Sequence, residues 1–104
     1  MTSKQRDRNV LKEYIKNYLI IRKCVGVEHY GIKCSESDPC CLEFDHVDPS
    51  QKKFTISKAV RARVSLPQLK TEIEKCVVRC ANCHKKRHFM DKNNEKIAQN
   101  PTEE

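Results

Sequence analysis

The segment Arg79–His88, which reads RCANCHKKRH, constrains the fold more than any other part of the chain. It holds two cysteines three positions apart, Cys80 and Cys83, and two histidines four positions apart, His84 and His88. Each pair has a spacing typical of metal ligands, yet the pairs overlap within nine residues. One small ion cannot easily use all four side chains. The segment therefore predicts two sites that share one short stretch of backbone.

The cysteine pair is typical of a zinc knuckle, in which a tight turn directs two thiolates at one tetrahedral ion. Such a pair supplies half of a site. For the other half we favour Cys24 and Cys34, because they lie in a glycine-bearing loop that is free to wrap an ion, with His29 as the alternative to Cys24. The remaining cysteines are expected to be small buried side chains: Cys40, Cys41 and Cys76.

The odd number of cysteines, seven, argues against a complete disulfide framework. The first residues, MTSKQRDRNV, lack the apolar stretch of a signal peptide. No apolar run approaches the roughly eighteen residues of a membrane span. We therefore expect an intracellular protein with no membrane contact, cytoplasmic or, in a eukaryotic or viral source, nuclear, whose cysteines bind metal.

The balance of charge points to a polyanionic partner. Lysine and arginine outnumber the acids 21 to 14, which gives a net charge of +7 over 104 residues. A chain of this length forms one small domain, which metal ions often help to stabilise. Nucleic acid is the first candidate for the partner, and a well-solvated basic surface is the alternative.

Hydrophobic periodicity and capping residues predict an α+β fold with three regions. Residues 1–23 are expected to contain an amphipathic helix packed on the domain, residues 24–90 the domain itself, and residues 91–104 a polar, flexible tail. Within the domain we expect two short strands and three helices. The strands begin at Leu42 and Cys76. The first helix of the domain is capped by Thr55 or Ser57, the second is capped by Ser65, and the third begins at Ala81 or Asn82.

The histidine pair belongs with the adjacent residues Asp45 and His46 of the first strand. A helix that carries His84 and His88 one turn apart can lie across a hairpin of the two strands and bring both imidazoles to Asp45. One carboxylate and two imidazoles leave open positions on an ion, as in catalytic sites. His46 then stands beside the ion without binding it, where it can take a proton from water near neutral pH.

Two motifs together, FDHVDP and CANCH, with KKFTIS and SLPQLKTEIEKC between them, resemble the HNH endonuclease family of phage and bacterial type. The resemblance runs from about Tyr18 to His88. It implies a small zinc-stabilised domain built on the ββα-metal (His-Me finger) motif, here with an added N-terminal helix. It also implies metal-dependent hydrolysis of DNA that leaves 5′-phosphate and 3′-hydroxyl ends.

The resemblance implies a role for each motif residue. The family's general base matches His46. The ligands of a catalytic Mg²⁺ or Mn²⁺ ion, with other divalent ions as alternatives, match Asp45, His84 and His88. The ligands of a structural Zn²⁺ ion match Cys24, Cys34, Cys80 and Cys83. Basic residues near the catalytic residues are expected to contact DNA phosphates: Lys52, Lys53, Lys85, Lys86 and Arg87.

The chain departs from the family pattern at two places. The first knuckle is expanded, because nine residues separate Cys24 from Cys34. Lys75 occupies the position of the asparagine that pins the loop holding the base, and a lysine side chain donates hydrogen bonds but cannot accept them. We expect the base to be held in another way. The alternative function is a non-catalytic zinc ribbon that binds nucleic acid, and a homodimer or a partner protein could supply targeting.

Overall fold

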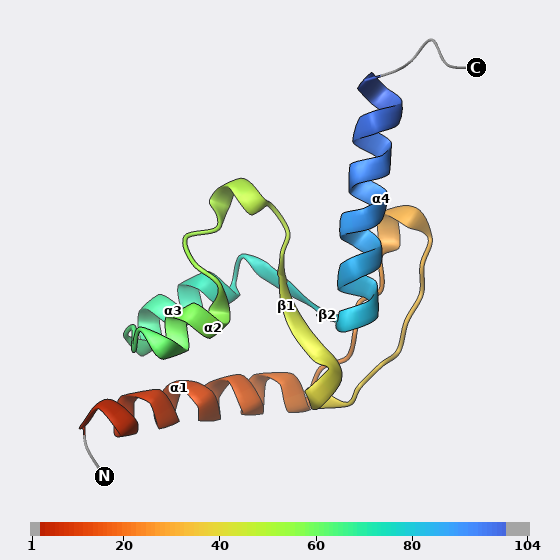
Figure 1. The fold of residues 1–104 in the computed structure, drawn as a ribbon. Helices are drawn as coiled ribbons and strands as arrows, with labels where there is room; N and C mark the ends of the chain where they lie inside the picture. Colours follow the sequence, from red (N-terminus) through yellow and green to blue (C-terminus); the bar gives the residue numbers. More distant parts are fainter. Residues whose placement is uncertain (1–2, 100–104) are drawn as a thin grey trace.

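The computed structural model describes residues 3–99 and forms a small α+β domain (Figure 1). Its strands are β1 (Leu42–His46) and β2 (Cys76–Cys80), which pair in an antiparallel sheet. The helices are α1 (Ser3–Ile20), α2 (Ile56–Arg61), α3 (Leu66–Ile73) and α4 (Ala81–Gln99). Short 3-10 turns lie at η1 (Glu28–Tyr30), η2 (Pro39–Cys41) and η3 (Pro49–Gln51). The predicted class and order of helices and strands are therefore confirmed.

The two-stranded sheet lies at the centre, with α1, α2 and α3 on one side and α4 on the other (Figure 1). Its register pairs Leu42 with Cys80 at one end and His46 with Cys76 at the other. Because side chains alternate along a strand, Leu42 and His46 face α1 and α3, whereas Asp45 faces α4. The sheet thus separates two environments, and α4 follows β2 with no intervening residue.

Helix α1 packs along the domain, as its periodicity predicted, and buries Leu11 and Leu19. The rings of Tyr18 and Phe44 lie 5.6 Å apart between centroids and join the two apolar clusters of the core. The helix ends at Ile20, three residues before the predicted end. Arg22 caps this end, because its guanidinium donates to the Tyr18 carbonyl in the last turn at 2.7 Å.

Side-chain caps fix the starts of the two middle helices. The Thr55 hydroxyl accepts a hydrogen bond from the Lys58 N–H at the start of α2, so Thr55 rather than Ser57 is the cap. Ser65 and Gln68 form a reciprocal capping box at the start of α3. Each cap contributes about 1 kcal/mol to the stability of its helix.

Residues 91–99, for which the sequence predicted a polar, flexible tail, continue α4 to Gln99. Asp91 is anchored at this point, since it accepts hydrogen bonds from Tyr30 and Arg87. A polar composition does not prevent a helix, and no glycine or proline interrupts the chain before Pro101. Residues 100–104 lie outside the described part of the chain. No helix among the described residues is long and apolar enough to cross a membrane.

Candidate metal centres

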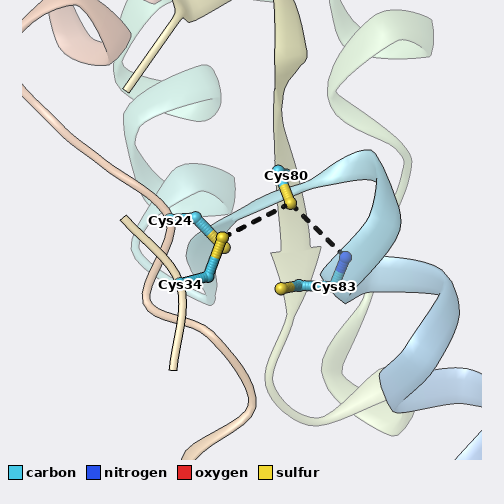
Figure 2. A group of neighbouring side chains, drawn as sticks. All are labelled: Cys24, Cys34, Cys80 and Cys83. Atoms are coloured by element: carbon cyan, nitrogen blue, oxygen red, sulfur yellow. Dashed lines mark hydrogen bonds between the residues drawn. The ribbon is translucent and has the colours of Figure 1, made fainter. Parts of the chain in front are cut away.

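Four cysteines converge where the loop after α1 meets the junction of β2 and α4. Figure 2 shows Cys24 and Cys34, from the loop, facing Cys80 and Cys83, from the junction. All four Sγ atoms lie within 4.8 Å of one another, and those of Cys34 and Cys80 are 3.9 Å apart. Thiolates 2.3 Å from a tetrahedral zinc ion lie about 3.8 Å from each other. The predicted set of four cysteines therefore has the spacing of a structural zinc site.

The backbone around these cysteines supports a metal site. The N–H of Gly26 points at Cys24 Sγ at 3.3 Å, and the N–H of Cys83 points at Cys80 Sγ at 3.4 Å. Such hydrogen bonds stabilise thiolates. Gly26 has a φ of 70°, and a Cβ there would lie 2.3 Å from the Ile32 carbonyl oxygen. Only glycine lets the loop fold back at this point, as the bridge between Val27 and Ile32 requires.

Burial makes a bound cation the natural partner of these thiols. Cys83 is 2% exposed, and its burial together with the neighbouring thiols raises its pKa to about 12. Burial also raises the pKa of Cys24. Thiolates packed this closely repel one another unless a cation compensates their charge. Zinc fits this donor set, and its binding would release the thiol protons.

The structure also places His29 and the three cysteines outside the cluster, which were expected to be an alternative ligand and small buried side chains, respectively. His29 does not belong to the group of converging ligands among the described residues, and its imidazole lies 3.6 Å from Asp91. Cys76 is half-buried and Cys41 is partly exposed. Cys40 is exposed, so the prediction of a small buried side chain is wrong there. The physical reason is that η2 begins at Pro39 on the surface and turns the Cys40 side chain outward.

A second cluster forms where α4 crosses the sheet. Ligand atoms of Asp45, His84 and His88 lie within 4.8 Å of one another, as the sequence predicted. His84 Nε2 faces Asp45 Oδ1 at 3.5 Å, and the two imidazole rings are 4.8 Å apart. His84 Nδ1 lies 2.9 Å from Glu43 Oε1. A carboxylate at Nδ1 favours the tautomer that leaves the Nε2 lone pair toward Asp45, a common arrangement behind metal-bound histidines.

Asp45 is held in place by two arginines. The carboxylate is 2% exposed and contacts Arg79 at 2.7 Å and Arg87 at 2.6 Å. Arg79 also donates to the Gly26 carbonyl, and Arg87 donates to the carbonyls of His46 and Val47. These contacts give the buried carboxylate a fixed orientation and satisfy its charge.

Arg87 is therefore not placed as a DNA contact, contrary to the prediction. Its guanidinium is 9% exposed, and all three of its nitrogens donate to groups of the protein. The reason is its position on α4, four residues after the buried Cys83 and hence on the same inward face. Lys85 and Lys86 point outward and are exposed. Lys85 also lines a hollow of about 350 Å³ with Glu43, His84 and His88.

His46 lies on the opposite face of β1 and contacts a buried carboxylate. Its Nε2 is 2.8 Å from Glu72 Oε2, and the two side chains are 8% and 2% exposed. Burial alone would raise the pKa of Glu72, but donation from the Lys75 ammonium and the Lys53 N–H outweighs it and lowers the pKa to about 2. Glu72 is thus ionised and can only accept, so the hydrogen of this bond lies on His46 Nε2, and Nδ1 is the ring nitrogen that does not contact the carboxylate.

Glu72 holds His46 in this structure, whereas Lys75 occupies the position at which the resemblance implied an asparagine. It contacts His46 through Oε2, and the same oxygen accepts from the Lys53 N–H in the following loop. The Lys75 side chain donates to Glu72 Oε1, while the Lys75 carbonyl accepts from the Val47 N–H. The loop after His46 is therefore held by the Glu72 carboxylate and by the Lys75 carbonyl. Sequence reasoning missed Glu72, although it follows Leu69 by three residues on the apolar stripe of α3.

A groove of about 710 Å³ adjoins both His46 and the second cluster. It is lined by Asp45, His46, His84 and His88 among others, so all four lie at one surface. Lys52 lies on its rim and is exposed, and Lys53 is exposed nearby. Sequence reasoning also missed Glu43 and Arg79. Glu43 shares a strand face with Asp45, and that alternation was the available signal.

The comparisons with known proteins add no relative: no protein-family model matches the chain, and neither a curated protein nor a solved structure was found to be similar. Function must therefore be argued from the geometry of the two clusters and from the motif residues.

Proposed function

We propose that this protein is a metal-dependent endonuclease of the HNH type that hydrolyses DNA phosphodiester bonds. The observation that carries the proposal is the meeting, at one groove, of Asp45, His84 and His88 with the separately oriented His46. The donor set of one carboxylate and two imidazoles fits a divalent ion, Mg²⁺ or Mn²⁺ first. A bound ion would neutralise charge that builds up on the scissile phosphate.

Residues around the ion would activate water, orient the ligands and bind the DNA. Glu72 keeps the proton on His46 Nε2, so Nδ1 is the atom that removes a proton from the attacking water. Arg79 and Arg87 hold the Asp45 carboxylate, and Glu43 orients His84. Lys52 lines the groove, Lys85 lines the hollow that shares His84 and His88 with it, and Lys86 is exposed on α4. These lysines would hold flanking phosphates, so DNA binding should weaken steeply with salt.

A plasmid cleavage assay tests this function. Chelators would also remove zinc, so the assay should keep zinc constant and supply or omit Mg²⁺ and Mn²⁺. We expect His46→Ala to lower the cleavage rate about 10²- to 10⁴-fold while DNA binding is retained. His29→Ala is the matched control, because His29 is more than half exposed and lies outside the groove. Equal cleavage by the parent and the His46→Ala protein would show that His46 is not the base.

The second candidate is a zinc-stabilised module that binds nucleic acid without cutting it. One observation favours it: two arginines already satisfy the Asp45 carboxylate, so its burial does not require a metal. In that case plasmid DNA would stay intact with every divalent ion, and binding would remain salt-dependent.

A further inference from the structure

The groove beside the second cluster has a lining that phosphate binding does not explain. Its volume of about 710 Å³ lies in the range of small-molecule pockets, about 300–1,000 Å³. Most of its lining is apolar and comes from α1, β1 and α2: Ile15, Leu19, Leu42, Phe44, Ile56 and Val60. DNA phosphates are held by cations and N–H groups, and the paired bases of a duplex remain stacked inside it. An intact duplex would therefore leave this apolar surface uncovered.

Three exposed basic residues from different parts of the chain line the groove. Lys12 on α1, Lys52 in the loop after β1 and Arg61 on α2 all line it and are exposed. A hollow with an apolar floor and a cationic rim matches the chemistry of an unpaired nucleotide, which has a flat apolar base and a phosphate on either side. Phe44 supplies an aromatic ring of the kind on which bases stack. Asp45, His84 and His88 line the same groove as Phe44, so a base in the groove would neighbour the second cluster.

We propose that the groove binds an unpaired base of DNA beside the scissile phosphate. The substrate would then be single-stranded DNA or a duplex with an extrahelical nucleotide, rather than a fully paired duplex. Extruding a base takes least energy when the base is already unpaired, which gives the selectivity. The position of the scissile phosphate rests on the proposed function, but binding of the base does not.

A binding assay tests the inference without cleavage. The His46→Ala protein, with zinc but without Mg²⁺ or Mn²⁺, is titrated against fluorescein-labelled DNA of one length, either fully paired or with a one-nucleotide bulge. Base stacking predicts about 5- to 150-fold tighter binding of the bulged DNA. A 2-aminopurine at the bulge should change its fluorescence when it enters the groove. Equal affinities for the two DNAs would overturn the inference.

Ser57 offers a way to fill the groove without touching the core. It is exposed, lies in α2 and lines the groove. In the same background, Ser57→Trp should abolish the preference for bulged DNA and leave duplex affinity unchanged, whereas Ser57→Ala should keep the preference. Phe44→Leu, which removes the aromatic face, should reduce it. Circular dichroism and zinc content establish that each variant is folded. A preference that survives both Ser57→Trp and Phe44→Leu would overturn the inference.

The two proposals can fail separately. A parent protein that prefers bulged DNA but cuts no DNA with any divalent ion would refute the nuclease function alone. A parent that cuts paired and bulged DNA equally, with equal affinities, would refute the base-binding groove alone.

Discussion

Glu72→Gln is the sharpest test of the buried contacts that hold His46. The Glu72 carboxylate accepts from Lys75 Nζ at 2.9 Å, from the Lys53 N–H at 3.0 Å and from His46 Nε2 at 2.8 Å. These contacts lower its pKa from 4.5 to about 2, although burial alone would raise it. A shift of this size corresponds to about 3 kcal/mol in favour of the folded state. A neutral glutamine keeps the shape of the side chain and loses this term.

The sign follows from the lowered pKa of the folded state. Stability from ionised Glu72 is fully present above pH 4.5, the ordinary value, and is lost as the pH falls through about 2. We expect Glu72→Gln to reduce the free energy of unfolding by about 3 kcal/mol at pH 7, and by progressively less below pH 4.5. Urea denaturation at a fixed zinc concentration measures this difference. Acid also displaces zinc, so parent and variant must be compared at each pH.

Glu74→Gln is the matched control, because Glu74 is exposed just after α3 and carries the same charge. We expect it to change stability by less than about 0.5 kcal/mol. The reasoning is refuted if the Glu72→Gln protein is as stable as the control at pH 7. A large loss that stays constant below pH 4.5 would contradict the electrostatic cause and leave only a packing defect.

Four further substitutions test the metal site, the buried ion pairs and the expected DNA contacts. Cys83→Ser should unfold the protein, because structural zinc contributes on the order of 10–16 kcal/mol, whereas Cys40→Ser should leave circular dichroism and zinc content unchanged. Arg87→Gln should reduce the free energy of unfolding by about 3–5 kcal/mol, since it removes a partner of the buried Asp45. Lys86→Gln should leave stability unchanged and lower the salt slope of DNA binding by about 1, and the reverse pattern for these two would restore Arg87 as the DNA contact.

Local patterns were sufficient to predict the helices and strands. The alternation that begins at Leu42 predicted β1, and Ser65 with Pro67 predicted the start of α3. The four zinc-site cysteines could also be predicted from the sequence, because few other cysteines lie in a loop that could reach Cys80 and Cys83. What sequence left open was the choice between Cys24 and His29, which depends on how the loop folds back at Gly26.

The burial of the charged residues Arg87 and Glu72 could not be predicted from their residue types. Arg87 was expected to contact DNA because it is basic and adjacent to His84 and His88 in the sequence, and Glu72 was not selected because acidic side chains are usually exposed. Both lie on helix faces that are otherwise buried, and only the packed structure reveals the partners that satisfy them. Helical spacing from Cys83 and from Leu69 indicates that Arg87 and Glu72 lie on inward faces of their helices. It does not indicate which side chains meet them there, because that depends on which elements pack against each face of the sheet.

Because β2 joins α4 directly, the number of residues between Cys80 and His88 determines how the two clusters are placed relative to each other. Cys80 ends the strand, Ala81 begins the helix, and His84 follows Cys83 without a gap. One residue inserted between Cys83 and His84 would turn both histidines by about 100° around the helix axis and advance them by about 1.5 Å. The zinc cluster would survive, but the histidines would point away from Asp45. Homologous chains should therefore vary in length between Cys24 and Cys34, where a loop absorbs the change, and keep the interval from Cys80 to His88 constant.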